Sequence, residues 1–475
     1  MSSNKPDIYN VLSRGLDWEP TYVDPASTNL ESYRTKVHYK DWKNFRDPFK
    51  MYYKEYVRIQ SEKENTLHAL REGADRYGHT RSINQRWLQG QKLFLAAVPL
   101  TEYAILRTHS YFSRIAPAQV LRIALMNQAM DEMRHAQNDF YLARDYNKYH
   151  QGFENGAIWR QNHPSIYNTR TYAEEALTAQ DPFETIVGFN FCFEVCHTNT
   201  LFVSVPATAA ANGDFVFAQM QLSTQSDESR HMAIGLATIR ALLEEDERNV
   251  PMIQNWFDKW YWRTHRIMAP ATSLFLDYFG ANRVESYKDV FQKYVVQDFV
   301  GGAVKDLEEL GLKPPRFLED SIREVDTMSL TTWRAFWQMR DGLFFKMVPP
   351  NDEDRAWLKS HYPAWKNTFE ELWDSDTPDI KNFAVNCQVC HLPCVFPDPV
   401  NPTIRKTSYS ERMFWFCSNG CKWIFEQEPA KYSSDRTWTE VGIYNDNKTN
   451  AKLLGLDYEP PLGGTLEENH LKTAY

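Results

Sequence analysis

Two copies of one short sequence decide the fold of this chain: Asp131-Glu132-Met133-Arg134-His135 and Asp227-Glu228-Ser229-Arg230-His231. In each copy a glutamate and a histidine stand three residues apart, so both side chains share one face if the segment is helical. A single glutamate precedes each copy: Glu132 lies 30 residues after Glu102, and Glu228 lies 34 residues after Glu194. That distance is the length of one helix, a turn and part of the next helix. Four carboxylates and two imidazoles in this order are what a pair of iron ions needs inside a helical bundle. The pattern therefore predicts a mainly α-helical fold around a two-iron site.

The spacing of the two copies matters because the bare motif Glu-Xaa-Xaa-His is a weak signal. It occurs four times, at Glu132/His135, Glu194/His197, Glu228/His231 and Glu467/His470. A lone copy is better explained by a solvated helix face. The ordered set of six is not, because oxygen-rich ligands suit iron and leave positions open for dioxygen. Four glutamates also balance the charge of two Fe(II) ions, so that the group can be buried without net charge.

Composition narrows the class of protein further. The chain has 475 residues, a net charge of −9 and a pI near 5.9, which gives no basic surface for nucleic acid. No apolar run approaches the roughly 18 residues of a membrane-spanning helix, and the polar N-terminus lacks a signal peptide. We therefore expect a cytoplasmic protein. Five of the seven cysteines lie between Cys387 and Cys421, which in a reducing compartment indicates a metal site.

The chain divides into four expected parts. Residues 1–50 have no sustained period and form an N-terminal arm, and residues 51–376 form the di-iron helical bundle. Residues 377–432 are rich in Cys, Pro and Asn and form a small metal-stabilised module, and residues 433–475 form a C-terminal tail. Within the bundle, Asp181-Pro182 is a cap and first turn for the helix that carries Glu194, and Asp214 is a candidate cap for the helix that carries Glu228.

The cysteine cluster has the spacing of a zinc site. Cys387 and Cys390 form one pair of thiolates, and Cys417 and Cys421 form a second pair after a 26-residue interval, which fits a tetrahedral zinc ion with four thiolate ligands. Cys394 is a spare or an alternative ligand. An iron–sulfur cluster fits the cysteine count alone. The segment Phe416-Cys417-Ser418-Asn419-Gly420-Cys421 resembles the treble-clef-like YHS modules, which bind a structural metal. Cys192 and Cys196, which flank Glu194, are expected to be small buried hydrophobic residues.

Two further segments carry a family resemblance. Gln225-Ser226-Asp227-Glu228-Ser229-Arg230-His231-Met232, and Phe193-Glu194 with Thr198-Asn199 one turn later, resemble the α subunit of the hydroxylase of bacterial multicomponent monooxygenases. The resemblance runs from about Asp17 to Tyr432 and is closest to the phenol and toluene hydroxylase branch. It implies a ferritin-like (ribonucleotide-reductase-like) helical bundle with a small C-terminal zinc module.

The resemblance also implies roles for individual residues. Glu102, Glu132 and His135 would bind one iron, and Glu194, Glu228 and His231 would bind the other. Thr198 falls on the family's active-site threonine, whose hydroxyl can hydrogen-bond oxygen species at the iron; its alternative is a helix threonine bonded to its own i−4 carbonyl. Asn199 and Gln225 match polar residues associated with component-dependent rearrangement of the site.

The implied activity is hydroxylation of phenol, toluene or benzene with dioxygen and electrons from NADH. An alkene or alkane monooxygenase of the same family is the alternative, and a desaturase-like di-iron enzyme is a more distant one. The resemblance implies β and γ hydroxylase subunits in an α2β2γ2 assembly, a small effector protein, an NADH-dependent reductase and in some cases a ferredoxin. The apolar substrate would lie near Val98, Ile105, Phe193 and Phe202, unless these residues simply pack the core.

Neighbouring residues separate this reading from other di-iron proteins. A radical-storing ribonucleotide reductase subunit needs a tyrosine one turn after the first histidine, where this chain has Asp139. Desaturases usually lack a zinc module, and ferritin-like stores are far shorter. The aspartates that precede the ligand glutamates, Asp131 and Asp227, are expected either to orient the histidines by accepting from Nδ1–H or to pair with Arg134 and Arg230.

Overall fold

The computed structural model describes residues 35–40, 42, 45–153, 164–179, 181–339, 345–347, 349–365, 387–392, 394 and 404–433. Regular structure in these residues is helical apart from one two-stranded hairpin, so the predicted mainly α-helical class is confirmed. Most of the expected arm (residues 1–34) and of the expected tail (residues 434–475) lies outside the described residues, as do parts of the cysteine-rich region.

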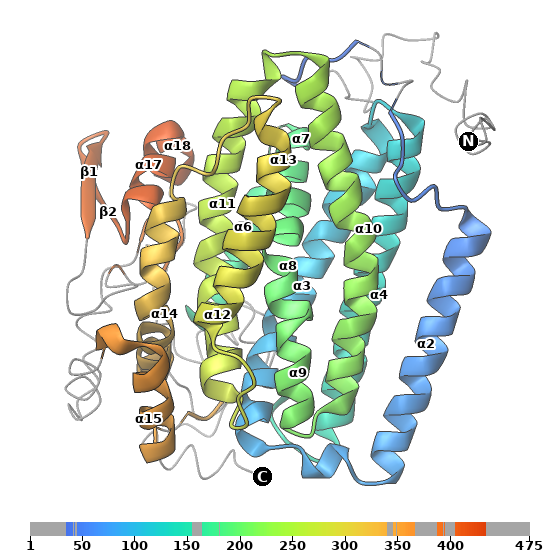
Figure 1. Cartoon of the computed structure of the whole chain (residues 1–475), viewed down its shortest axis with the longest axis vertical. Helices are drawn as coiled ribbons and strands as arrows, with labels where there is room; N and C mark the ends of the chain where they lie inside the picture. The colour runs from blue at the N-terminus through green and yellow to red at the C-terminus, as the bar shows by residue number, and fades with distance from the viewer. Residues whose placement is uncertain are drawn as a thin grey trace.

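The first pair of helices is formed by α3 (Gln85–Ile115) and α4 (Gln119–Asn147), which pack along each other (Figure 1). Only residues 116–118 join them, so the two helices run antiparallel. At the start of α3, the Asn84 side chain accepts hydrogen bonds from the first backbone N–H groups, which no helical carbonyl can reach. The helix then continues through Pro99 towards Glu102. The first glutamate and the first Glu/His pair are thereby brought to neighbouring helices.

The second pair begins with a long helical rod that spans Pro182–Ala211 and is followed by α10 (Phe215–Glu245). Asp181 accepts from Phe183 N and Asp214 accepts from Phe217 N, so both predicted helix caps are confirmed. Gly213, at φ +85°, makes the sharp turn that reverses the chain before α10. The rod consists of α7 (Pro182–Thr185), the π-helix η6 (Ile186–Val195), α8 (Cys196–Phe202) and α9 (Ser204–Ala211).

The rod is apolar enough in composition and length to cross a membrane, which corrects the expectation that no stretch approaches this limit. However, 78% of its most apolar window is buried inside the protein. It also carries Glu194, whose neighbours are charged residues of other helices. Its apolar composition is therefore that of a mostly buried core helix.

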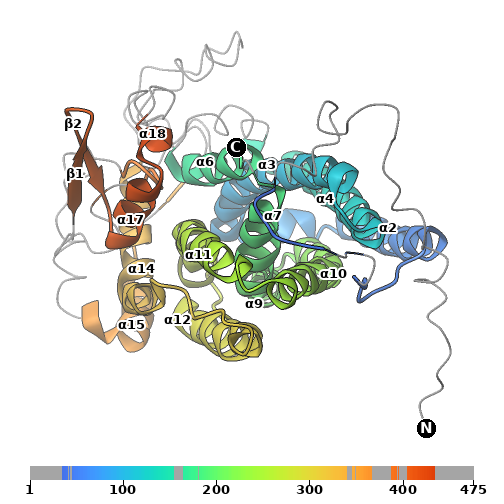
Figure 2. The same cartoon turned by 90° about the horizontal axis from the view of Figure 1, so that it is seen from above.

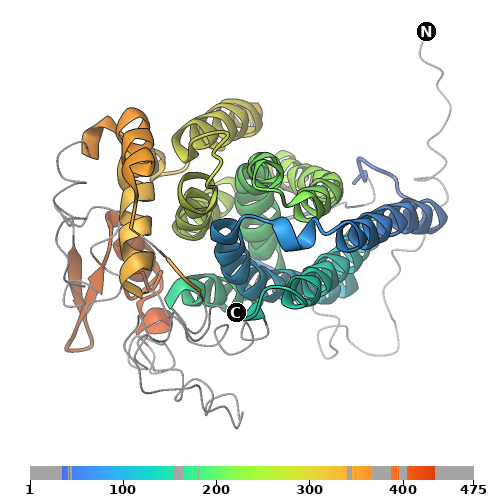
Figure 3. The same ribbon diagram turned by 90° about the horizontal axis from the view of Figure 1, so that it is seen from below.

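Other helices enclose this centre, as Figures 2 and 3 show from above and below. The helix α10 packs against η6, α4 and α2 (Tyr53–Arg76), and α11 (Asn249–Ser273) packs against η6. Indole rings such as those of Trp87 and Trp260 are fully buried between the layers. The remaining elements are η4 (Thr80–Ser82), α6 (Pro164–Leu177), η7 (Leu274–Phe279), α12 (Tyr287–Phe291), η8 (Gln292–Val304), α13 (Lys305–Glu308), α14 (Leu318–Met339), α15 (Asp352–His361) and η9 (Pro363–Trp365).

The cysteine module, meaning the described residues 387–392, 394 and 404–433, lies at the opposite end of the molecule from α2 (Figures 1 and 2). Its strands β1 (Arg405–Tyr409) and β2 (Arg412–Phe416) pair antiparallel. Ser410 and Glu411 form the two-residue loop, both with positive φ, as a tight hairpin of right-handed twist requires. The helices α17 (Asn419–Gln427) and α18 (Pro429–Tyr432) follow.

The module is packed tightly onto α11. A Cβ atom added at Gly420 would overlap the indole ring of Trp262, so the backbone approaches this ring as closely as a glycine allows. The Trp262 indole N–H also donates to the Ser418 hydroxyl at 3.2 Å. The cysteine module is therefore anchored to a helix that itself packs on η6.

Candidate metal centres

Six side chains from four helical elements meet in the middle of the bundle. They are the six residues that the sequence predicts as iron ligands, and all are buried, the most exposed being Glu102 at 6%. The helix α3 contributes Glu102, η6 contributes Glu194, and the two Glu/His pairs come from α4 and α10. Glu102, Glu132 and His135 form one group that can hold a metal ion, and Glu132, Glu228 and His231 form another.

The two imidazoles face the carboxylates with the same nitrogen. His135 Nδ1 lies 3.7 Å from a carboxylate oxygen of Glu102 and 3.3 Å from one of Glu132. His231 Nδ1 lies 3.8 Å from Glu194 and 3.3 Å from Glu228. Each histidine therefore has one carboxylate of its own helix and one from the preceding helix beside it.

Two of the carboxylates also reach the opposite histidine. Glu132 lies 3.2 Å from His231 Nδ1, and Glu228 lies 3.6 Å from His135 Nδ1. Glu132 and Glu228 thus lie between the two imidazoles, whereas Glu102 and Glu194 are each near one of them. This is the arrangement that two metal ions sharing bridging carboxylates require.

The electrostatics of the six groups favour a bound cation. Burial, together with the nearby charges of Glu102 and Glu228, raises the pKa of Glu132 well above its usual value, and the pKa of Glu194 rises in the same way. Burial would lower the pKa of His135, but its hydrogen bonds with carboxylates raise that pKa well above the usual value. A cluster of this kind holds protons unless another positive charge replaces them. The donor set therefore fits a pair of divalent metal ions.

The two aspartates orient the histidines crosswise between the two sequence copies. His135 Nε2 lies 3.3 Å from Asp227, and His231 Nε2 lies 3.1 Å from Asp131. The expected contact with Nδ1 is not formed, because this nitrogen faces the carboxylate cluster in both histidines. With Nε2–H donating to an aspartate, Nδ1 presents its lone pair to the centre. Each aspartate therefore contacts Nε2 instead of the expected Nδ1, and the histidine that it contacts belongs to the other copy of the motif.

The alternative role of these aspartates, pairing with arginine, is present as well. Arg230 bonds Asp131 at 2.7 Å and Asp227 at 2.5 Å, and Arg134 also pairs with Asp227. Burial alone would raise the pKa of Asp227, but contacts with histidine and arginine lower this pKa far below its usual range. Both aspartates are therefore held as anions by positive groups on two sides.

The helix α2 supplies contacts that sequence reasoning missed. Tyr56 donates to Asp131 at 2.9 Å, and the Gln60 amide donates to both Asp131 and Asp227 at 2.8 Å. Lys63 Nζ lies 2.5 Å from Asp227. These residues recur about one helical turn apart on one face of α2, but nothing in the local sequence links that face to helices some 70 or 160 residues away.

Two amides one turn before glutamate ligands were also missed. The Gln128 amide donates to Glu194 at 2.7 Å, and the Asn190 amide donates to Glu194 and to the side-chain oxygen Oε1 of Gln128, both at 2.9 Å. Asn190 in turn lies 2.8 Å from His109 Nε2, a fully buried ring whose pKa is lowered to about 4 by burial. Their i−4 spacing from Glu132 and Glu194 is a sequence signal that could have identified both amides.

The three predicted polar residues of the active site lie on the two helices beside the cluster. Thr198 is buried, and its hydroxyl has no hydrogen-bond partner, so it does not form the i−4 backbone bond considered as its alternative. The Gln225 amide donates to the Asn199 side chain at 2.7 Å, which ties α10 to α8. Both of these residues are half-buried.

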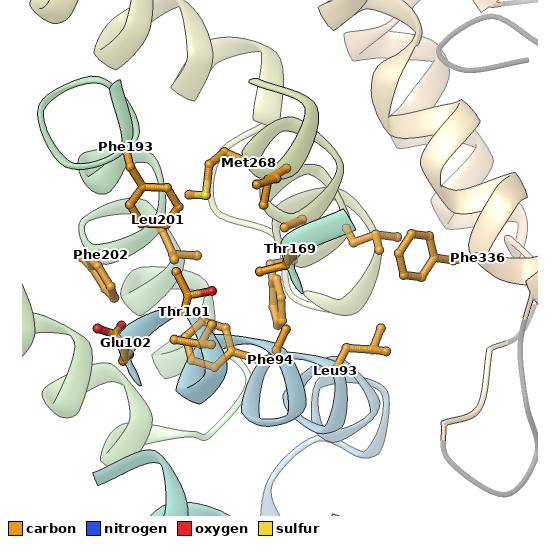
Figure 4. A pocket seen from close by; sticks show the side chains of 16 residues that line it. Leu93, Phe94, Thr101, Glu102, Thr169, Phe193, Leu201, Phe202, Met268 and Phe336 are labelled. Atoms are coloured by element: carbon orange, nitrogen blue, oxygen red, sulfur yellow. The ribbon is translucent and has the colours of Figure 1, made fainter. Parts of the chain in front are cut away.

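An apolar cavity of about 80 Å³ lies against the cluster, and Glu102 forms part of its wall (Figure 4). Val98, Phe193 and Phe202, three of the four residues expected near the substrate, line this cavity. Ile105 is not among its lining residues, because the wall formed by α3 extends from Leu93 to Glu102 and ends before Ile105. The other lining residues are Phe94, Ala97, Thr101, Thr169, Leu201, Ile267, Met268, Ala271, Leu274, Phe275 and Phe336.

The four predicted zinc ligands also come together. Cys387, Cys390, Cys417 and Cys421 are fully buried, and their sulfur atoms lie within 4.8 Å of one another. All are free thiols in a group that can hold a metal ion. Cys394 is buried nearby but is not part of this group. Four thiols at tetrahedral spacing fit zinc.

The remaining two cysteines are separate from both clusters. Cys192 and Cys196 are fully buried, and burial raises the pKa of each thiol well above its usual value. Neither belongs to a described group that can hold a metal ion. This environment agrees with the expectation that they are small hydrophobic core residues.

The bundle, with six buried Glu and His side chains gathered at its centre, is typical of ferritin-like proteins that hold a pair of metal ions. The model of the methane/phenol/alkene hydroxylase family matches residues 18–246, and that of the YHS domain matches residues 397–436. The chain belongs to this hydroxylase family and is a phenol-hydroxylase-like α subunit of a multicomponent monooxygenase. The Glu/His groups can hold the two irons of the family, and the four thiols can bind zinc.

Individual relatives agree with the family assignment. The oxygenase component of phenol 2-monooxygenase from Pseudomonas sp. strain CF600 is 34% identical over 94% of this chain and 88% of its own. The α subunit of the alkene monooxygenase oxygenase from Xanthobacter autotrophicus is 26% identical over 90% of this chain and 88% of its own. The crystal structure of phenol hydroxylase from Pseudomonas sp. OX1 superposes with a TM-score of 0.85 at 29% identity, covering 99% of this chain and 100% of that chain.

Proposed function

We propose that this chain is the catalytic large subunit of a monooxygenase that hydroxylates aromatic compounds such as phenol, toluene or benzene. It would use dioxygen and electrons that originate from NADH. The observation that carries the proposal is the shared residue Glu102, which belongs both to the buried carboxylate cluster and to the wall of an apolar cavity. An apolar molecule in that cavity is held next to the metal centre.

The proposed ligand assignment follows from the distances between side chains. Glu102, Glu132 and His135 would hold one iron, and Glu194, Glu228 and His231 the other. Since Glu132 and Glu228 each lie near both histidines, they would help to hold both irons. When bound, the two irons supply the activation of dioxygen, which amino-acid side chains cannot provide.

The protein's own contribution is to hold the ligands and to exclude water. The crossed bonds to Asp131 and Asp227 keep each histidine in the tautomer that presents Nδ1 to the centre. Gln128 and Asn190 hold the carboxylate of Glu194 in one orientation. We assign the unpartnered Thr198 hydroxyl to hydrogen bonding on the side of the metal centre where dioxygen would bind. We assign the Asn199–Gln225 pair to the response of the site to partner proteins.

The assembly is proposed from the family. Relatives carry the names of oxygenase components, which implies further subunits and redox partners. We propose β and γ subunits in an α2β2γ2 hydroxylase, a small effector protein and an NADH-dependent reductase, with a ferredoxin as a candidate additional carrier, in the cytoplasm. We also propose the four-part division of the chain, with the bundle at residues 51–376, the zinc module at 377–432, and an arm (1–50) and tail (433–475) at the ends.

A second candidate is an alkene or alkane monooxygenase of the same family. The cavity of about 80 Å³ favours a small substrate, because an engineered apolar cavity that admits benzene measures about 150 Å³. Several relatives are named propane 2-monooxygenases, including one from Gordonia sp. strain TY-5 that is 28% identical. A single aromatic ring would require the side chains around the cavity to move apart.

Metal analysis together with an assay of the reconstituted complex tests the proposal. We expect two irons and one zinc per chain, and dioxygen- and NADH-dependent hydroxylation of phenol and toluene in the presence of the partner proteins. Protein grown with abundant iron that contains none would contradict the oxygenase function. Oxidation of propene or propane without hydroxylation of the aromatic compounds would instead establish the second candidate.

A further inference from the structure

The wall of the substrate cavity contains one polar atom that has no partner. Among the sixteen residues that line the cavity, only Thr101, Glu102 and Thr169 have polar side chains. Glu102 is engaged with His135 and Glu132 in the metal cluster. The Thr101 hydroxyl is buried, with 4% of the residue exposed, and forms no hydrogen bond. It is the only described lining residue with a buried polar side-chain atom of this kind.

The Thr101 hydroxyl does not bond the backbone of its own helix. A threonine in a helix commonly bonds the carbonyl oxygen one turn earlier. Thr108, on the same helix, does so by donating to Ala104 O at 2.9 Å. Thr101 does not, and Figure 4 shows its side chain among the residues that surround the cavity, next to Glu102. Thr101 therefore lines the cavity with a hydroxyl that no protein group satisfies.

We propose that Thr101 is a specificity-determining residue that hydrogen-bonds the hydroxyl group of a phenolic substrate. The inference rests on the proposed aromatic hydroxylation and names the substrate class: a single ring that bears a hydroxyl, in preference to a hydrocarbon of the same shape. A threonine hydroxyl offers one donor and two lone pairs, so it can bond a phenol in either direction. Once the side chains around the cavity have moved apart to admit the ring, the remaining wall contacts its apolar part.

The preference for phenol follows from the cost of an unmade hydrogen bond in a buried site. When toluene occupies the cavity, a methyl group faces the Thr101 hydroxyl, which stays unpartnered. When phenol occupies it, both hydroxyl groups are satisfied. A neutral hydrogen bond of this type corresponds to a preference of about tenfold. Because Thr101 directly precedes Glu102 on α3, the same bond would fix the orientation of the ring beside the metal cluster.

The test compares Thr101→Val with Thr108→Val in the complete hydroxylase with its partner proteins. Valine has nearly the shape of threonine and lacks the hydroxyl. We expect Thr101→Val to reduce kcat/KM for phenol relative to toluene by about tenfold, mainly through a higher KM for phenol. Thr108→Val removes a hydroxyl from the same helix outside the cavity, so it should leave the phenol-to-toluene ratio unchanged. Thr101→Ser should restore most of the preference for phenol.

An unchanged phenol-to-toluene ratio in Thr101→Val would overturn the inference, whereas the aromatic hydroxylase function would stand as long as both compounds are oxidised. If the wild-type complex oxidises neither compound, the proposed function fails separately. In that case calorimetric binding of phenol and toluene to the iron-loaded hydroxylase still tests Thr101. Equal affinities in the wild type, or an equal loss of both in Thr101→Val, would contradict the proposed hydrogen bond.

Discussion

The Glu/His cluster and the cluster of four cysteines are both buried, but they are built in opposite ways. The first collects six side chains from four helical elements, with up to 129 residues between them, from Glu102 to His231. The second collects four thiols from a short turn and from the end of β2 with the start of α17. The Glu/His side chains thus come from helices far apart in the sequence, whereas the four thiols come from two short segments.

The two clusters differ equally in their surroundings. The Glu/His cluster shares Glu102 with an apolar cavity, so a molecule in that cavity would lie beside the cluster. No lining residue described for that cavity belongs to the cysteine module. Instead, two buried arginines of α11 lie near the thiols. Burial would lower the pKa of Arg266, but the charge of Cys417 helps raise this pKa well above its usual value. The comparison indicates a reactive centre in the bundle and a closed structural site in the module.

The largest expected effect on turnover comes from Glu132, one of the two carboxylates that lie between the histidines. Glu132→Gln should abolish binding of at least one iron and reduce turnover by more than about 100-fold, exceeding the roughly 10–100-fold cost of losing an outer partner of a metal ligand. The metal-free protein should become more stable, by roughly 1–3 kcal/mol, because one of four crowded carboxylates is gone. Iron analysis and thermal unfolding measure the two effects, with Glu244→Gln on the exposed face of α10 as control. A variant that keeps both irons would contradict the proposed role of Glu132.

The same cluster predicts how pH acts on the metal-free protein. Glu132 and Glu194 have pKa values raised above the ordinary 4.5, and His135 and His231 have pKa values raised above 6.5. All four groups hold protons more tightly in the folded state. The free energy of unfolding should therefore fall as pH rises from about 4.5 and continue to fall through the raised histidine pKa values.

Bound iron should remove most of this pH dependence, because metal replaces the protons. Denaturant unfolding of metal-free and iron-loaded protein between pH 5 and pH 8 provides the measurement. The stabilisation by iron should grow with pH, and a constant difference across this range would argue against proton–metal competition at the cluster.

The next effect concerns the closed site. Cys417→Ser should remove zinc and unfold the cysteine module, since the free energy of zinc binding in such modules, about 10–16 kcal/mol in isolated zinc fingers, is folding free energy. Iron content of the bundle should stay at two. Hydrogen exchange of residues 404–433 and zinc analysis measure the loss. Cys394→Ser, a buried thiol outside the group of four, is the matched control and should retain zinc.

A smaller effect is expected from the crossed aspartates. Asp227→Asn should weaken iron binding by about 10–100-fold, because the amide no longer holds His135 through a charged acceptor. Asp131→Asn should act similarly through His231, and Asp298→Asn on the exposed face of η8 should have no effect. Iron titrations give the affinities. If Asp227→Asn disturbed only the spectroscopic signature of its own copy's His231, the crossed arrangement would be wrong.

The smallest effect tests how the module is joined to the bundle. Gly420→Ala places a Cβ atom against the Trp262 ring, with no room for it, and should destabilise the docked module by about 1–3 kcal/mol. Gly73→Ala, in the interior of α2 with open space around it, should instead stabilise the protein by about 0.4–1 kcal/mol. Unfolding midpoints distinguish the two. Equal stability of both variants would mean that the contact with α11 is not tightly packed.

Sequence reasoning succeeded where the information is local. The i, i+3 spacing of Glu and His, the caps at Asp181 and Asp214, and the paired cysteines each depend on a few consecutive residues. It was less successful with long-range partners. The crossed contacts to Asp131 and Asp227, and the three residues of α2 that hold those aspartates, connect segments that nothing in the local pattern relates.

The amino-acid sequence by itself determined which side chains are available as metal ligands and which helices carry them, because residue spacing sets the face of a helix. Only the tertiary structure decided which carboxylates lie between the two histidines, which nitrogen each histidine presents, and where the cavity ends relative to Glu102 and Ile105. These properties depend on how helices are rotated and shifted against one another, and that packing is set by the whole core.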